Sequence, residues 1–255
     1  MTNKTETNLS GPVSHSYEIA LQRQYYRDTA QSYDNQHLGA DDSHSFALAI
    51  FLSTIDHFKF GSVLDLGSGT GRVLEYIQKN RANVDVIGVE PVDELRRAGH
   101  AKGIDPRQLI EGDASSLNFA DGSIDVVCSF ALLHHVRDPA LVISEMLRVA
   151  RKAIFISDSN NFGQGSWWAR CVKQAINAIG LWSLANYVKT VGKGYLISEG
   201  DGLSYSYSVF NNFSQIKRSC KTIHIINTDT AGLNPYRTAP TVALIGLKHG
   251  NDDHG

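Results

Sequence analysis

The stretch VLDLGSGTG, residues 63–71, joins a strand-like apolar run to a glycine-rich turn, and a helical pattern opens directly after it. Glycine at positions 67, 69 and 71 permits positive φ and lets backbone N–H groups approach a ligand without a Cβ in the way. A strand that ends in such a turn places the ligand at the carboxyl edge of a parallel sheet. Arg72 stands where a dinucleotide fingerprint requires glycine or alanine, and no Gly-Lys-Ser/Thr follows. The turn therefore indicates neither a dinucleotide site nor a phosphate P-loop.

Outward from this turn, strand-like and helical patterns alternate along the chain. The expected strands are 62–66, 85–90, 108–110, 124–130 and 153–157, and the expected helices between them are 72–79, 92–101 and 139–149. Such alternation specifies a parallel sheet covered by helices on both faces. Asp138 and Pro139 support one helix start, as N-cap and first helical residue.

Two more strand-like runs, 222–227 and 241–247, end the chain, and the Gly/Pro-containing loop between them is short enough for antiparallel pairing. The predicted fold class is α/β, a doubly wound Rossmann-like sheet of seven strands, mostly parallel, with a C-terminal antiparallel hairpin. An N-terminal helical segment and a helical lid inserted after the fifth strand complete it.

The predicted organisation is one domain, 15–250, behind a disordered polar leader, 1–14. Helical spacing places two leading helices at 15–30 and 43–58, the second capped by Asp42 or Ser43. The parts expected along the domain are N-terminal helices or a lid at 15–60, a cofactor-binding core at 61–158, an acceptor-binding insertion at 159–221 and the strand pair at 222–248.

Composition excludes several classes of protein. The 255 residues are 42% hydrophobic with a net charge of −2 and no basic block, which is enough for one core and disfavours a nucleic-acid partner. Cys128, Cys171 and Cys220 lie far apart, so no disulfide framework or structural zinc site is indicated. The chain shows neither a signal-peptide pattern nor an apolar run of ~20 residues, which predicts a cytoplasmic protein without stable membrane insertion. The oligomeric state stays open.

Three acidic residues follow three successive predicted strands. Asp65 precedes the glycines, where a carboxylate suits a positively charged amino group better than a phosphate. Glu90 ends the second strand and can accept hydrogen bonds from both hydroxyls of a ribose. Asp113 comes just after the third strand, where it can accept from the exocyclic amine of adenine. Together the three acids predict a nucleoside that carries an amino acid.

With these residues the chain resembles the class I S-adenosylmethionine-dependent methyltransferases, especially their small-molecule branch. The motifs that carry the resemblance occur in the family's order and spacing: VLDLGSGTG (63–71), GVEP (88–91), EGDASSLNFADGSIDVV (111–127) and SFALLHHVRDPALVISEMLRV (129–149). The resemblance implies S-adenosylmethionine as the cofactor and a set of contacts to it. These are Asp65, Gly67, Ser68, Gly69 and Gly71 at the methionine end, Glu90 at the ribose, Pro91, Asp113 and Ala114 at the adenine, Phe130 and Leu133 beside the cofactor, and Tyr33 closing over it.

The resemblance also implies in-line attack on the sulfonium methyl, a reaction in which positioning supplies much of the rate. His134 and His135 follow the fourth predicted strand, and Asp158 ends the fifth on the same edge of the sheet. Histidine is suited to accept a hydroxyl proton at neutral pH. We therefore consider His135 or His134 as the general base with Asp158 orienting it, and catalysis by proximity alone as the alternative.

The insertion is the expected binding region for the methyl acceptor. Residues 166–188 are apolar over much of a helix circumference. This pattern fits a lid packed on the core, an apolar acceptor pocket or weak contact with a membrane surface. The cations available for such contact are dispersed: Arg170, Lys173, Lys189 and Lys193. Residues 204–208 alternate hydroxyl side chains, typical of an edge strand or of a surface for a polyhydroxylated acceptor. No helical His/Glu set indicates a metal site.

The predicted function is methyl transfer to an oxygen of a small molecule, such as a sugar, glycan or natural-product hydroxyl. Nitrogen and carbon acceptors stay open, as does a non-catalytic cofactor-binding member of the fold. Residues 129–132 lack the Asn-Pro-Pro-Tyr type motif of amino-methylating enzymes, which disfavours DNA as a substrate. A nicotinamide oxidoreductase is disfavoured by Arg72 and by the terminal hairpin.

Overall fold

The computed structural model describes residues 15–29, 43–198, 201–230 and 232–249. The predicted leader, Tyr33 and the capping residue Asp42 lie outside the described residues. The two leading helices are confirmed as α1 (His15–Thr29) and α3 (Ser43–Phe58).

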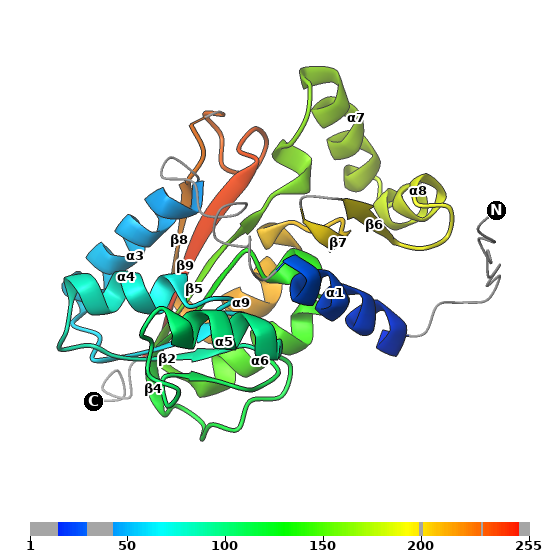
Figure 1. Cartoon of the computed structure of the whole chain (residues 1–255). Coiled ribbons are helices and arrows are strands. Elements are labelled where there is room, and N and C mark those ends of the chain that lie inside the picture. The colour runs from blue at the N-terminus through cyan, green and yellow to red at the C-terminus, as the bar shows by residue number, and fades with distance from the viewer. Residues whose placement is uncertain (1–14, 30–42, 199–200, 231, 250–255) are drawn as a thin grey trace, which may run out of the picture.

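A seven-stranded sheet forms the centre of the molecule (Figure 1). Its strand order is β3-β2-β1-β4-β5-β9-β8, with β1 to β5 parallel and β9 antiparallel to both of its neighbours. The predicted fold class is thereby confirmed. The strands are β1 (Ser62–Leu66), β2 (Asp85–Val89), β3 (Leu109–Ile110), β4 (Ile124–Phe130), β5 (Ala150–Ser159), β8 (Cys220–Asn227) and β9 (Thr241–Lys248).

Helices cover both faces of the sheet, because successive strand residues are apolar on both sides. Val63, with neighbours from β2, β4 and β5, packs against α3 and α4 (Arg72–Asn80). Leu64 points to the opposite face, where α6 (Pro139–Val149) and α9 (Phe213–Ser219) lie. The sequence did not predict α9. The expected cap of α6 is confirmed, since the Asp138 side chain accepts from the backbone N–H of Ala140.

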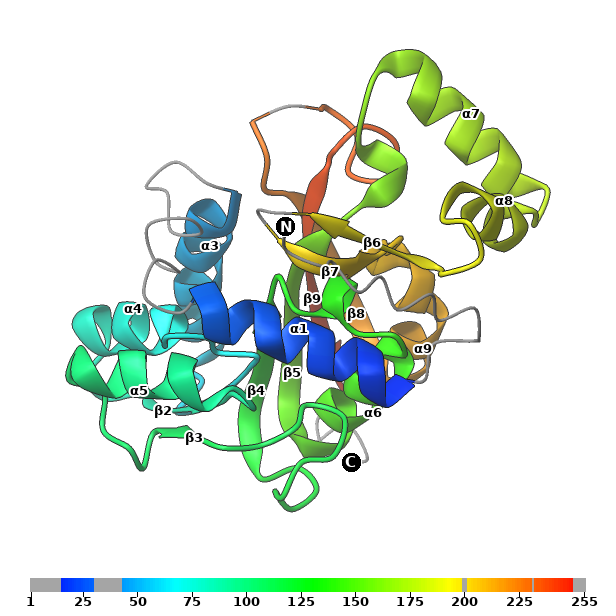
Figure 2. The same ribbon diagram turned by 45° about the vertical axis from the view of Figure 1, so that its right-hand side comes forward.

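The remaining core helix, α5 (Asp93–Ala101), lies beside β3, and α1 runs across the molecule near α5 and β7 (Figure 2). None of the described helices is long and apolar enough to cross a bilayer.

The insertion after β5 leaves the sheet and returns at a narrow neck. Asn160 and Ser208 form an isolated antiparallel bridge, and the Ser208 hydroxyl donates to the Asn160 side-chain oxygen at 2.9 Å. Beyond the neck lie two helices and a separate two-stranded sheet: α7 (Trp167–Ala178), α8 (Trp182–Lys189), β6 (Tyr195–Ser198) and β7 (Gly202–Tyr205). The expected single apolar helix is wrong, because Gly180, at φ 76°, separates α7 from α8.

Gly71 serves packing at the start of α4. Its φ is +88°, and a Cβ built there would lie 2.1 Å from the Cδ1 atom of Ile104. We expect Gly71→Ala to lower the free energy of unfolding by about 3 kcal/mol, from backbone strain plus the clash. Gly103 is a matched control, since its φ is +102° and a Cβ there meets nothing within 4 Å. Gly103→Ala should cost only about 1 kcal/mol in urea denaturation; equal losses would contradict the packing role.

Candidate active site

The glycine turn forms one wall of the candidate site at the carboxyl edge of β1. The backbone N–H groups of Gly67 and Ser68 donate to the carbonyl of Val89, which anchors the turn to the next strand. Gly67 and Gly69, with φ of 67° and 56°, line open space. Gly71 lines neither of the two cavities at this edge and lies against Ile104, while its contact with the cofactor stays a prediction.

Asp65 is buried at the end of β1 with one oxygen unpaired. Its Oδ1 receives a weak hydrogen bond from the Cys128 thiol at 3.6 Å, while Oδ2 has no hydrogen-bond partner among the described residues. Burial raises the pKa of Asp65 to about 7, and the nearby Glu90 carboxylate adds to the increase. A buried carboxylate oxygen without a partner is costly, and an ammonium group of a ligand would satisfy it.

Glu90 is buried beside the turn and held by backbone donors. Its Oε2 accepts from the N–H of Gly69 at 3.0 Å and its Oε1 from the N–H of Val92 at 2.9 Å. Burial raises the pKa of Glu90, and these two hydrogen bonds oppose the increase. Each carboxylate oxygen can accept a further hydrogen bond, so Glu90 can still take two ligand hydroxyls.

The first of three neighbouring cavities lies between the strand ends and α1. Seven of the residues predicted to contact the cofactor line it: Gly67, Gly69, Glu90, Pro91, Asp113, Ala114 and Phe130. Asp113 is half exposed, accepts from the Ser115 N–H and hydroxyl, and pairs with Arg23 of α1 at 3.3 Å. This ion pair, which the sequence did not predict, brings α1 to the adenine end expected for the cofactor.

Two other predicted contacts fall elsewhere. Leu133 is fully buried in the core and lines none of the three cavities, because the 3₁₀ turn Leu133–His135 directs it inward and its neighbour Leu132 outward. Ser68 lines the second cavity and donates its hydroxyl to the Asp65 carbonyl at 2.9 Å. Tyr33 lies outside the described residues. Tyr26 of α1 lines the first two cavities and packs edge-on against His135.

His134 and Asp158 form a buried ion pair, as their places in the sequence predicted. The Nδ1 atom of His134 lies 2.7 Å from Oδ1 of Asp158, whose carboxylate also accepts from the backbone N–H groups of Leu133 and Ser159. Burial opposes a charge on His134, but Asp158 and Asp201 outweigh it and raise the pKa to about 10. An imidazolium at neutral pH has no lone pair to accept a proton, so the raised pKa favours His135 over His134 as the general base.

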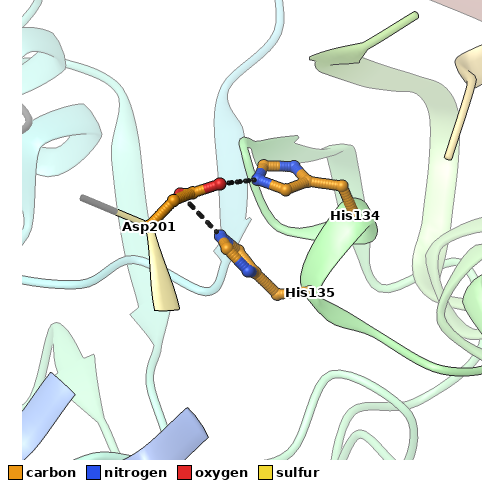
Figure 3. A group of neighbouring side chains, drawn as sticks. All are labelled: His134, His135 and Asp201. Atoms are coloured by element: carbon orange, nitrogen blue, oxygen red, sulfur yellow. Dashed lines mark ion pairs between the residues drawn. The ribbon is translucent and has the colours of Figure 1, made fainter. Parts of the chain in front are cut away.

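Asp201 is the site residue that sequence reasoning missed. It lies at the start of the β6–β7 return, 66 positions after His135, and no motif surrounds it. Its two oxygens lie 3.3 Å from Nε2 of His134 and 3.3 Å from Nε2 of His135, and both rings turn these nitrogens toward it (Figure 3). The histidines hold the pKa of Asp201 far below its usual range, although burial opposes this. Asp201 thus stays an anion.

His135 is held at the junction of the first two cavities. Its Nδ1 lies 2.7 Å from the carbonyl oxygen of Leu203 and 3.2 Å from the side-chain nitrogen of Gln22. The other nitrogen, Nε2, faces Asp201 and the second cavity. His134, His135 and Asp201 also offer three ligand atoms within 4.8 Å of one another, so they are the residues that could hold a metal ion, a site that sequence spacing did not predict.

A second cavity joins the donor side to this cluster, and a third continues it into the insertion. The second is lined by Asp65, Ser68, His134, His135 and Asp201. The third shares His134, Ser159 and Asp201 with it. Most of the third cavity's other lining side chains are polar: Asn161, Gln164, Asn186, Lys189, Thr190, Ser204, Tyr205, Ser206 and Tyr207, with Tyr195 and Leu196.

Comparison with known proteins fits this geometry. Residues 64–156 match the family model described as a methyltransferase domain. The matched segment is a methyltransferase domain, and the fold around it is that of the S-adenosylmethionine-dependent methyltransferases among the solved structures. The matched segment holds β1 to β5, and with them Asp65, Glu90, Asp113 and the histidine pair.

Relatives of this methyltransferase chain differ in what their names say they methylate. An uncharacterized methyltransferase of Mycobacterium sp. (strain KMS) is 34% identical over 113 residues, 44% of each chain. The phosphatidylethanolamine N-methyltransferase of Cereibacter sphaeroides is 30% identical over 132 residues, 46% of this chain and 58% of the relative. The chain thus spans about half the length of the first curated relatives it matches.

Solved structures share the fold at low identity. Magnesium protoporphyrin IX methyltransferase from Synechocystis PCC 6803, solved with bound SAH, gives a TM-score of 0.57 at 13% identity, covering 91% of this chain and 100% of that one. The methyltransferase family and such neighbours imply S-adenosylmethionine as the methyl donor.

Proposed function

We propose that the chain transfers the methyl group of S-adenosylmethionine to an oxygen atom of a small-molecule acceptor. The observation that carries the proposal is the meeting of the cavities. The buried, unpartnered oxygen of Asp65 belongs to the second cavity, and so do the two imidazoles that Asp201 holds. A donor on one side and an acceptor on the other would meet at this junction.

The residues of the first two cavities fit the donor. The Asp65 carboxylate would accept from the ammonium of its methionine part, and Glu90 would accept from its ribose hydroxyls. Pro91, Asp113 and Ala114 would border the adenine. When bound, the donor supplies a methyl carbon made electrophilic by the sulfonium charge.

The third cavity supports an acceptor with polar groups. Amide and hydroxyl side chains dominate its lining, and the Tyr207 hydroxyl is buried without a hydrogen-bond partner among the described residues. A hydroxyl-bearing acceptor, such as a sugar-like group, would satisfy them. An apolar pocket, the other sequence-based interpretation of the insertion, has less support because the apolar side chains of α7 and α8 face outward.

We assign the acceptor's proton to His135. Its Nε2 is the ring nitrogen that faces the second cavity, where it would take the proton of an incoming hydroxyl, and Asp201 would stabilise the imidazolium that forms. His134 would remain charged between two carboxylates and position Asp201. A proton acceptor is needed for a hydroxyl, whereas an amine that enters neutral attacks without one, so this arrangement favours oxygen over nitrogen.

The test combines binding and transfer. Calorimetric titration at matched concentrations should give micromolar binding of S-adenosylmethionine and none of NAD. Donor labelled in its methyl group should then transfer label to a member of a panel of monosaccharides, glycosides and phenols. Binding of NAD alone would refute the assignment, and donor binding with no transfer to the panel would favour a non-catalytic member.

Treatment with a chelator distinguishes a general base from a bound metal ion at this cluster. Because the proposed proton acceptor is an imidazole, treatment with EDTA should leave the transfer rate unchanged. A rate lost with EDTA and restored by zinc or magnesium would instead place a cation on His134, His135 and Asp201.

A further inference from the structure

The helices α7 and α8 turn their apolar faces away from the protein. On α7 the stripe of residues at spacings of three and four is exposed, and Trp168 is 72% exposed. On α8 and the turn after it a second such stripe is exposed, and Val188 is 69% exposed. The two stripes are Trp168, Cys171, Val172, Ala175 and Ile179 on the first helix, and Leu184, Tyr187, Val188 and Val191 on the second.

The opposite, more polar face of each helix is fastened to the protein. Lys173 donates to the carbonyls of Asn161 and Gln164, and Gln174 donates to the carbonyls of Phe162 and Arg237. The Trp182 indole donates to the Ser206 hydroxyl at 3.1 Å. These hydrogen bonds set the rotation of both helices, so the outward direction of the apolar stripes is built into the fold.

The pair of helices stands out from the rest of the molecule (Figure 1). Neither helix contains a buried residue, whereas α4, α5 and α6 each bury three or more. Exposed apolar side chains gathered on two neighbouring helices mark an interaction site.

The charge of this segment identifies the kind of partner. Residues 159–198 contain four cationic side chains and neither aspartate nor glutamate, although the whole chain carries a net charge of −2. Lys173 is tied to the protein and Lys189 lines the third cavity, so Arg170 and Lys193 are the cations that flank the stripes. Apolar stripes with paired tryptophans and flanking cations are typical of helices that lie in the interface of an anionic bilayer. A second copy of the chain would bring two segments of like charge together, which opposes self-association.

We propose that α7 and α8 dock on an anionic membrane surface, with the stripes of both helices inserted among the headgroups. With 12 and 8 residues, the helices are too short to span a bilayer and suit its interface. The other face of α8 supplies Asn186, Lys189 and Thr190 to the third cavity. Docking would therefore bring the third cavity close to the headgroups. The acceptor would then be the polar head of an amphiphile, and this assignment of the acceptor is the part that rests on the proposed function.

Intrinsic fluorescence tests the docking directly, since Trp167, Trp168 and Trp182 are the three tryptophans of the chain and all belong to this segment. Vesicles of phosphatidylcholine and phosphatidylglycerol in equal amounts should shift the emission to the blue and sediment the protein. Vesicles of phosphatidylcholine alone should bind much less, and raised salt should weaken the anionic binding. The assay needs no methyl donor, so it stands apart from any failure of the proposed function.

Variants give the decisive comparison. Trp168→Ser combined with Val188→Ser removes one exposed side chain from each stripe and should weaken vesicle binding by roughly tenfold or more. Phe46→Ser on α3 is the matched control, because Phe46 is 54% exposed and lies outside the segment; it should bind like the unmodified chain. Donor titration should be unchanged in both variants.

The proposal fails if the unmodified chain ignores anionic vesicles or if the double variant binds as tightly as the control. It also fails if sedimentation velocity finds a dimer that the double variant dissociates, because a second copy would then be the occupant.

Discussion

Replacing His135 with asparagine should slow methyl transfer by about 10²- to 10⁴-fold, the usual contribution of a positioned general base. The asparagine amide can still donate to the Leu203 carbonyl, which His135 Nδ1 now approaches at 2.7 Å, but it leaves no nitrogen facing Asp201. The loss should therefore fall on kcat, with donor affinity nearly unchanged. Steady-state kinetics with the acceptor found in the panel would measure it.

A matched control completes this test. His57, exposed at the end of α3, should tolerate the same change to asparagine with no loss of rate. Undiminished turnover in His135→Asn would mean that catalysis proceeds by proximity alone.

Asp65→Asn should weaken S-adenosylmethionine binding by about 2–4 kcal/mol, or roughly 30- to 1000-fold. The change keeps the shape of the side chain and removes the charge that would receive the donor's ammonium. Calorimetric titration measures the effect, and Asp125→Asn is a control, since Asp125 is buried too but pairs with Arg151 away from the cavities. Unchanged donor affinity in Asp65→Asn would refute the assignment of the methionine end.

The pKa of Asp65 adds a pH dependence to this prediction. Below its folded-state pKa of about 7 the carboxylate is protonated, so donor affinity should fall by about tenfold per pH unit between 7 and 5. The same raised pKa means that the folded protein keeps a proton that the unfolded chain releases above the ordinary carboxyl pKa of 3.8. Stability should therefore fall as pH rises from about 4 to about 7, and Asp65→Asn should be more stable than the unmodified chain at pH 8.

The sequence was sufficient to predict the sheet and the donor side of the site. Buried parallel strands are continuous apolar runs, so β1 and β4 were predicted with the bounds that the structure has. The acids at the ends of β1, β2 and β3 follow from strand ends alone, because parallel strands finish at one edge. His134 and Asp158 met for the same reason.

The acceptor side depended on contacts that spacing cannot reveal. Asp201 reaches the histidines through a separate hairpin whose position is set by the neck at Asn160 and Ser208. Periodicity identifies the apolar face of a helix but not the direction in which that face points, so the segment 166–188 fitted a lid as well as a docking surface. In the structure, Lys173 and Gln174 of α7 donate hydrogen bonds to the protein, and these bonds turn the apolar face of the helix outward.

The neck has an evolutionary consequence. Since Asn160 and Ser208 bring both ends of the excursion together, the chain between them can lengthen, shorten or be exchanged at a small entropic cost without displacing β5 or α9. Most residues proposed to hold the donor lie on the sheet side of this neck, and most of the lining of the third cavity, proposed for the acceptor, lies on the other. Descendants of such a gene could acquire new substrates by remodelling this module around Asp201 while inheriting the donor side of the sheet edge intact.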